Sequence, residues 1–257
     1  MLPKITIITP TLNQGIFLER TIQSVLKQNY PHVEFFVLDG GSTDQTLEIL
    51  ERYSQQLCYW SEPDTGQSQA INKGLARASG DIVAFLNSDD EYEPNALLTV
   101  GQYFLKHPEA EWVCGKCRII DEGGNERYGW ITRYKYLLLR FGNLHLLSVV
   151  NFIAQPAVFW KRELINEVGY FDESLSVVMD YDYWLRLIQK SPYHFIDAYL
   201  ARFRIYRTSK TVRAAREHSF EEDLVVKRYV RSKVLLLAHL LHRQLIIWSY
   251  KLLFRQS

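Results

Sequence analysis

The 257-residue sequence contains only three cysteines. An odd number of cysteines does not build the disulfide framework that is typical of small secreted domains. Cys114 and Cys117 form a single C-x-x-C pair within a strand-like run, without the second pair that a zinc site needs. We therefore expect buried thiols in a reducing, cytoplasmic compartment.

The sequence also has almost no net charge, and it lacks an N-terminal targeting signal and a long apolar run. Its formal net charge of +1 is far from the basic excess of nucleic-acid-binding proteins, so we expect no nucleic-acid partner. Residues 1–4 lead directly into a strand-like run without the pattern of a signal peptide. The Leu-rich stretch 134–152 is interrupted by Arg140 and His145 and cannot span a bilayer. We expect a cytoplasmic protein, and a peripheral location on the inner face of the plasma membrane stays open.

In the first 110 residues, β-branched apolar runs alternate with apolar residues at helical spacing. Strands are predicted at residues 4–9, 33–38, 57–60 and 82–86, with helices between them. This alternation predicts an α/β fold with a mostly parallel central sheet flanked by helices. After residue 110 the pattern becomes irregular. A strand is predicted at 112–120 with a return arm at 126–130, and another strand at 155–160, so residues 111–212 should form a smaller, partly antiparallel half of a 1–212 domain.

Polar residues follow three of the predicted strands, at residues 9–13, 39–44 and 87–90. In open parallel sheets, ligands bind outside the carboxyl ends of the strands, so the three clusters should converge on one site. The adjacent carboxylates of Asp89 and Asp90 would suit a hard divalent cation such as Mg²⁺ or Mn²⁺. A solvated turn that caps the helix after Pro94 is the alternative, and the convergence favours the site.

Asp180 and Asp182 lie in the first turn of a helix predicted from residue 180 to about 190. A capping role is the simple interpretation, since the helix dipole favours anions there. Residues two apart on a helix diverge, so at most one of the two carboxylates should face a site.

Residues 213–257 combine basic and apolar residues and form a predicted C-terminal helical extension. The basic residues include Arg213, Arg216, Lys227, Arg231 and Lys233, followed by a Leu-rich run. Amphipathic helices of this composition lie on anionic membranes, or they pack on the domain or on a second subunit of a homodimer. The sequence leaves these interpretations open.

Five segments together resemble the motifs of family 2 glycosyltransferases, inverting enzymes with the GT-A fold. They are residues 5–13, 37–44, 70–74, 86–90 and 180–186. The resemblance covers roughly residues 3–210, and its specificity comes from the order and spacing of the five motifs rather than from any single one.

The resemblance assigns roles to individual residues. Donor binding is implied for Thr9, Pro10, Thr11, Asp39, Lys73, Asn87 and Ser88, the metal-ligand position for Asp89, and the catalytic base for Asp180. Three positions depart from the family pattern. Asn87 replaces an Asp, Met179 replaces a Glu, and Tyr206 replaces a His that serves as a further metal ligand.

The implied reaction is inverting, metal-assisted sugar transfer in polysaccharide biosynthesis. The donor would be a nucleotide sugar, with a UDP-sugar as first choice, and the acceptor a glycan or a lipid-linked glycan selected by residues 120–175. Because of the three departures, a nucleotide-sugar-binding or assembly protein with an impaired site is the main alternative. A sugar-1-phosphate nucleotidyltransferase would need a Gly-rich basic loop after the first strand, where this chain has Pro10, Thr11 and Asn13.

Overall fold

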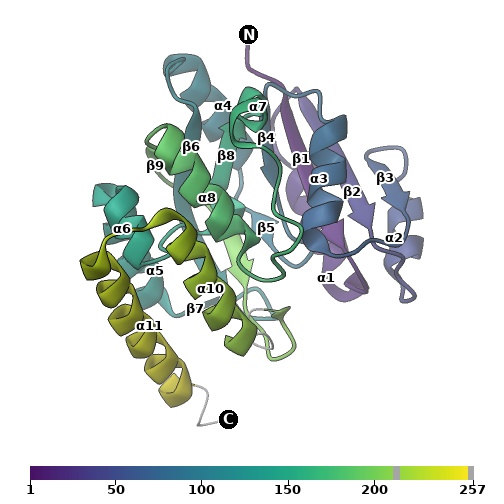
Figure 1. Ribbon diagram of the computed structural model, residues 1–257. Coiled ribbons are helices and arrows are strands. Elements are labelled where there is room, and N and C mark those ends of the chain that lie inside the picture. The colour runs from purple at the N-terminus through teal and green to yellow at the C-terminus, as the bar shows by residue number, and fades with distance from the viewer. Residues whose placement is uncertain (211–214, 254–257) are drawn as a thin grey trace.

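The computed structural model describes residues 1–210 and 215–253 and has a central sheet with helices on both faces (Figure 1). The order in the sheet is β3-β2-β1-β4-β8-β6-β9-β5, and β7 pairs with β6. The strands are β1 (Ile5–Thr11), β2 (Val33–Asp39), β3 (Cys58–Ser61), β4 (Ile82–Phe85), β5 (Glu91–Tyr92), β6 (Trp112–Ile120), β7 (Glu126–Arg127), β8 (Val158–Lys161) and β9 (His194–Arg204). The helices are α1 (Gly15–Leu26), α2 (Thr46–Arg52), α3 (Gln67–Arg77), α4 (Ala96–Lys106), α5 (Gly129–Phe141), α6 (Leu144–Val149), α7 (Ile165–Val168), α8 (Met179–Lys190), α10 (Ala215–Tyr229) and α11 (Lys233–Leu253), with short 3-10 turns η1 (Gln155–Ala157) and η2 (Arg162–Leu164).

In the parallel half of the sheet, β1 and β4 are buried on both faces and the edge strand β3 is partly exposed. β1 pairs in parallel with β2 and β4, and β2 pairs in parallel with β3. Ile7 of β1 packs with the core that includes α1 and α4, whereas Ile8 packs with the core that includes α3 and α8. This alternation follows from the two-residue period of a strand and explains why Ile7 and Ile8 are both fully buried.

The second half of the sheet is mixed. β8 is antiparallel to β4 and β6, while β6 and β9 are parallel, with an irregular register around Lys116. Most paired residues of the sheet are nevertheless in parallel ladders, so the predicted fold class is confirmed. The predicted division between residues 212 and 213 falls outside the described residues.

Three predicted strand boundaries are wrong. β1 continues through Pro10 to Thr11, which pair with β2. Proline has no N–H to donate, and none is required at Pro10 because β4 ends before it and the last bond to that strand runs from Leu86 N to Ile8 O. The predicted return arm at 126–130 is limited to β7, and α5 begins at Gly129. The predicted strand at 155–160 begins as the 3-10 turn η1 and becomes extended only in β8.

The last two helices pack on the same body. Val225 and Val226 of α10 are fully buried in the core that contains α8. His239 Nδ1 of α11 lies 3.2 Å from the carbonyl oxygen of Val149 in α6. In Figure 1, α11 forms the outer layer of this side of the molecule. Among the described helices, none is long and apolar enough to cross a membrane.

Helix α3 approaches the sheet closely at Gly74. A Cβ atom at this position would lie 2.7 Å from Cγ2 of Ile8 in β1. We therefore expect Gly74→Val to lower the free energy of unfolding by about 1–3 kcal/mol through overpacking, although valine is the better helix former. Ala76→Val, on the exposed side of the same helix, should change it by no more than about 0.5 kcal/mol. Equal urea midpoints for the two variants would contradict this close packing.

Candidate active site

The carboxyl ends of β1 and β2 bring the first two polar clusters together. Thr11 and Asp39 are partners in the parallel register, and Gly40 N donates to Thr11 O at 2.9 Å. The next turn is tied as well, since Asn13 N donates to the hydroxyl of Ser42 at 2.7 Å. The two clusters therefore form one surface at this edge of the sheet.

Asp39 is buried and held by several donors. Its Oδ2 accepts from the Ser61 hydroxyl at 2.6 Å and from Gly41 N at 3.2 Å, and its Oδ1 accepts from the Ser42 hydroxyl. Only 2% of the residue is exposed. A ligand N–H that bonds to Asp39 must therefore share the carboxylate with these hydroxyls.

The segment from Thr9 to Thr11 is buried at the end of β1. The hydroxyls of Thr9 and Thr11 have no hydrogen-bond partner within the described part of the chain. Thr9 is fully buried, whereas Thr11 is 5% exposed and stands at the strand end. Buried hydroxyls normally find a partner, so Thr11 is the one placed to bond a ligand at this edge.

The turn after β4 carries the third cluster. Asp90 is fully buried and its Oδ1 accepts from Arg204 N at 2.8 Å. Burial, followed by the neighbouring Asp89, raises the pKa of Asp90 well above its usual range. Ser88 is also buried. Asp90 is thus a structural residue that fixes this turn against β9.

Asn87 is engaged at both ends of its amide. Its Oδ1 accepts from Gln67 Nε2 at 2.6 Å, and its Nδ2 donates to Gln155 Oε1 at 3.1 Å and to Asp90 Oδ2 at 3.3 Å. Gln155 in turn donates to the carbonyl of Phe85 at 2.6 Å. Asn87 therefore belongs to a network that joins β4 to α3 and η1.

Asp89 is half-buried and faces Tyr206. The Tyr206 hydroxyl lies 3.0 Å from Asp89 Oδ2 and 3.2 Å from Gln14 Oε1, and its single proton can bond only one of these acceptors at a time. Burial raises the pKa of Asp89, and the hydrogen bond from Tyr206 opposes that rise. A cation next to Asp89 would favour its charged form.

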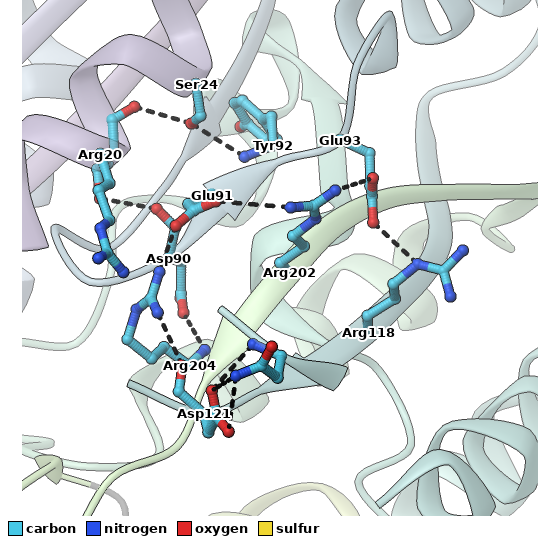
Figure 2. Close-up of polar contacts among 12 residues, drawn as sticks. Arg20, Ser24, Asp90, Glu91, Tyr92, Glu93, Arg118, Asp121, Arg202 and Arg204 are labelled. Atoms are coloured by element: carbon cyan, nitrogen blue, oxygen red, sulfur yellow. Dashed lines mark hydrogen bonds and ion pairs between the residues drawn. The ribbon is translucent and has the colours of Figure 1, made fainter. Parts of the chain in front are cut away.

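Arg204 holds the backbone around Asp89. Its guanidinium is fully buried and donates to Asp89 O at 2.8 Å and to Glu122 O at 3.0 Å. It also donates to Asp121 O at 2.8 Å and pairs with Glu91 (Figure 2). The ring of Phe17 covers the guanidinium at 4.8 Å. Two loops from distant parts of the sequence, residues 89–91 and 121–122, are thereby fixed to the end of β9.

Asp180 lies in the first turn of α8 and is half-buried. Burial raises its pKa above the ordinary value for an aspartate, whereas the positive charges of Lys135 and Lys210 oppose the rise. Asp182 is instead buried against Arg186 at 2.9 Å and the Tyr229 hydroxyl at 2.7 Å. The two carboxylates face different surroundings, as the helical spacing predicts.

Lys210 connects Asp180 to the turn after β4. Its Nζ donates to Gln67 Oε1 at 2.9 Å, and Gln67 bonds Asn87. Lys73, by contrast, pairs with Glu62 at 2.9 Å, and Glu62 N donates to Asp39 O. The structure thus places Lys73 near the Asp39 end of the site, whereas Lys210 bonds Gln67 and its charge lowers the pKa of Asp180. Gln67, Lys135 and Lys210 were not predicted from the sequence.

The side chains that could serve as metal ligands suit a metal ion that binds together with a substrate. Within residues 1–210 and 215–253 no group of three His, Cys, Asp or Glu side chains could hold a metal. Mg²⁺ and similar ions often bind through one or two carboxylates together with substrate phosphates. Asp89, with its one accessible carboxylate, suits that mode.

A family model described as "Glycosyl transferase family 2" matches residues 6–169. The chain belongs to glycosyl transferase family 2. It is 27% identical over 216 residues to an uncharacterized glycosyltransferase of Rickettsia typhi, covering 81% of this chain and 66% of that protein. It is 29% identical over 189 residues to a PGL/p-HBAD biosynthesis glycosyltransferase of Mycobacterium tuberculosis, covering 72% of this chain and 69% of that protein. The chain thus spans about two thirds of the length of these family 2 relatives.

Solved structures share the GT-A fold with this family 2 chain. The S. aureus TarS 1-349 complex with UDP-GlcNAc matches with a TM-score of 0.66 and 20% identity, covering 87% of this chain and 65% of that one. The mannosyltransferase PcManGT from Pyrobaculum calidifontis, in complex with GDP-Man and Mn²⁺, matches with a TM-score of 0.67 and 20% identity, covering 93% and 69%.

Replacing the buried Arg204 should destabilise the whole family 2 domain. Arg204→Met would leave the Glu91 carboxylate and three carbonyls without their donor, so we expect the free energy of unfolding to fall by about 3–5 kcal/mol. Arg127→Met is the matched control, because Arg127 is exposed and pairs with Asp121 at the surface, where ion pairs contribute little. Urea denaturation of both variants measures the difference, and equal stabilities would refute the structural role of Arg204.

Proposed function

We propose that this family 2 glycosyltransferase transfers a sugar, with inversion, from a nucleotide-sugar donor to a hydroxyl group of a glycan or lipid-linked acceptor. The observation that carries the proposal is the convergence of the Thr11–Asp39 edge and the turn of Asn87 and Asp89 at the carboxyl ends of β1, β2 and β4. Asp180 follows Met179, whose sulfur accepts from Ser68, and the neighbouring Gln67 bonds Asn87. In the proposed division, residues 1–110 bind the donor and residues 111–212 bind the acceptor.

Asp180 is the proposed general base. It is half-buried, and its Oδ1 accepts a hydrogen bond from Tyr181 N at 2.8 Å. In this proposal its Oδ2 accepts the proton of an acceptor hydroxyl. As that proton moves to Asp180, the acceptor oxygen bonds to the anomeric carbon. The bond from that carbon to the diphosphate oxygen breaks, and the diphosphate leaves with the electron pair. One displacement of this kind inverts the anomeric centre.

The remaining residues bind the donor in this proposal. Thr11, supported by Pro10 and by the fully buried Thr9, packs on the base, and Asp39 bonds its edge. Lys73 helps to neutralise the diphosphate, and Asn87 and Ser88 contact donor hydroxyls. A Mg²⁺ or Mn²⁺ ion at Asp89 would stabilise the negative charge of the leaving diphosphate.

Two comparisons support the substrate class without fixing the sugar. The S. aureus protein was solved with UDP-GlcNAc and the Pyrobaculum protein with GDP-Man and Mn²⁺. The mycobacterial relative is named for PGL/p-HBAD biosynthesis. We propose a UDP-sugar as the donor and a glycan or lipid-linked acceptor of polysaccharide biosynthesis.

A donor-binding protein with an impaired site is the second candidate. Met179, which precedes Asp180, is 4% exposed and its sulfur accepts from the Ser68 hydroxyl at 2.7 Å. The side chain at this position is thus locked into the core and provides no carboxylate. A chain that binds a donor and never turns over would agree with this candidate.

Separate variants of Asp89 and Asp180 should distinguish donor binding from chemistry. We expect Asp180→Asn to keep donor affinity and to slow nucleoside diphosphate release by roughly 10²–10⁴-fold, the range of general-base catalysis. We expect Asp89→Ala to lose the gain in donor affinity that Mn²⁺ produces. The measurements are thermal shift with UDP-, GDP- and dTDP-sugars with and without Mn²⁺, followed by release kinetics.

Asp197→Asn is the control, since Asp197 is exposed and bonds Lys116 and Tyr136, neither of which belongs to the candidate site. Wild-type release rates in Asp180→Asn would eliminate Asp180 as the base. Donor binding without release in the unmodified chain would favour the second candidate.

The acid limb of the pH–rate profile should reflect the ionisation of Asp180. Burial raises its pKa, so the base is charged above that pKa and activity falls as the pH drops through it. Lys135 and Lys210 lower this pKa and Glu222 lies nearby as a further charge. We expect Lys135→Met to move the acid limb of kcat to higher pH, because a positive charge that favours the ionised base is lost.

Arg133→Met removes an equal charge from the exposed side of α5 and should leave the acid limb in place. A shift to lower pH in Lys135→Met, or the same shift in both variants, would disprove the role of Lys135.

A further inference from the structure

Helix α5 exposes a stripe of large apolar side chains. Trp130 is 57% exposed, Leu137 55% and Phe141 69%, with Tyr134 between them at 39%. Their spacing of four, three and four residues places them on one side of the helix. The opposite side carries the buried Leu139 and so packs on the domain.

Helix α11 exposes a second stripe with the same kind of spacing. Val234 is 76% exposed, Leu237 57%, Leu241 60% and Leu245 64%. The opposite side of the helix includes His239, which is buried against α6. The exposed leucines are therefore not needed for docking α11 on the domain.

The two stripes lie next to each other. Tyr134 of α5 and His242 of α11 are joined by a contact of 3.2 Å between the phenol oxygen and Nε2, and their rings stack at 6.5 Å. We call the combined surface the α5–α11 face; it comprises Trp130, Leu137, Phe141, Val234, Leu237, Leu241 and Leu245. An exposed apolar surface of this extent marks an interaction site.

The charge of these helices is one-sided. The sequences of α5 and α11 contain six lysines and arginines and no aspartate or glutamate, in a chain whose net charge is only +1. Arg133, Arg140 and Lys233 are exposed on them. All acidic residues of the chain therefore lie outside the two helices that carry the apolar stripes.

We propose that the α5–α11 face docks on the surface of an anionic lipid bilayer. Apolar side chains flanked by basic ones are the composition of helices that lie in the membrane interface. A second copy of the chain fits less well, since a symmetric pair would bring two basic faces together. Because no described helix can cross a membrane, the contact is peripheral.

Docking in this way would place at the lipid surface the helix whose Lys135 acts on the candidate base. The positive charge of Lys135, the residue after Tyr134, lowers the pKa of Asp180. This inference about the acceptor rests on the proposed function, and it favours an acceptor sugar that is carried by a lipid.

Vesicle sedimentation of the full chain tests the face without using catalysis. We expect binding to vesicles of phosphatidylglycerol and phosphatidylcholine, a decrease with added salt, and at least tenfold weaker binding to phosphatidylcholine alone. Trp130→Gln/Leu137→Gln in α5 and Leu237→Gln/Leu241→Gln in α11 should each weaken binding to the anionic vesicles at least tenfold. Leu47→Gln/Leu105→Gln, which alters exposed leucines of α2 and α4, should bind like the unmodified chain.

Thermal unfolding and donor-induced thermal shifts of each variant show that it is folded, so loss of vesicle binding cannot be attributed to misfolding. Normal vesicle binding by the α5 variant would overturn the combined face, and equal binding to neutral vesicles would overturn the charge argument. A dimer in solution that both variants abolish, with no vesicle binding, would identify a second copy as the partner. Failure of sugar transfer with intact vesicle binding would refute only the proposed function.

Discussion

The buried guanidinium of Arg204 is the interaction on which the candidate site depends. It is fully enclosed, and it satisfies the Asp89 carbonyl, the carbonyls of Asp121 and Glu122 and the Glu91 carboxylate at once. A buried charge is tolerated only when it is paired and hydrogen-bonded throughout, so these loops cannot shift independently. Tyr206, two residues further along the chain, is thereby held at Asp89. The geometry of the turn after β4 is thus determined largely by the end of β9.

This arrangement divides the two adjacent carboxylates. Asp90 is fully buried, bonds the backbone of β9 and has its pKa raised well above the usual range. Asp89 is half-buried, and its Oδ2 lies 3.0 Å from the phenol oxygen of Tyr206. A phenol supplies no strong metal-ligand atom of the kind that an imidazole does, so a cation at Asp89 depends on oxygens from the substrate. The departures at Asn87 and Tyr206 therefore bear on how tightly a metal is held before the donor binds.

Periodicity was enough to predict β2 and β4 and the convergence of their polar ends, because these strands are buried on both faces and read as apolar runs. It failed at Pro10, whose place in β1 depends on β4 ending early, and at β9, where polar and aromatic residues alternate irregularly across a bulge. Gln67, Lys135 and Lys210 were missed for a different reason. They reach the site from segments far apart in the sequence, and no local pattern encodes such contacts. The role expected of Asp180 came from the family resemblance, since its spacing alone equally predicts a helix cap.

Helix α5 links the two proposals through its composition. On its inner side, Lys135 lowers the pKa of Asp180, and an acidic residue there would raise that pKa and weaken the charged base at neutral pH. On its outer side, an acidic residue among Trp130, Leu137 and Phe141 would be repelled by anionic lipid. Both surfaces therefore disfavour aspartate and glutamate for separate electrostatic reasons, and the helix contains neither. Neither electrostatic constraint applies to α10, which packs on α8 through Val225 and Val226. That helix does contain an acidic residue, Asp223, which pairs with Arg243 of α11.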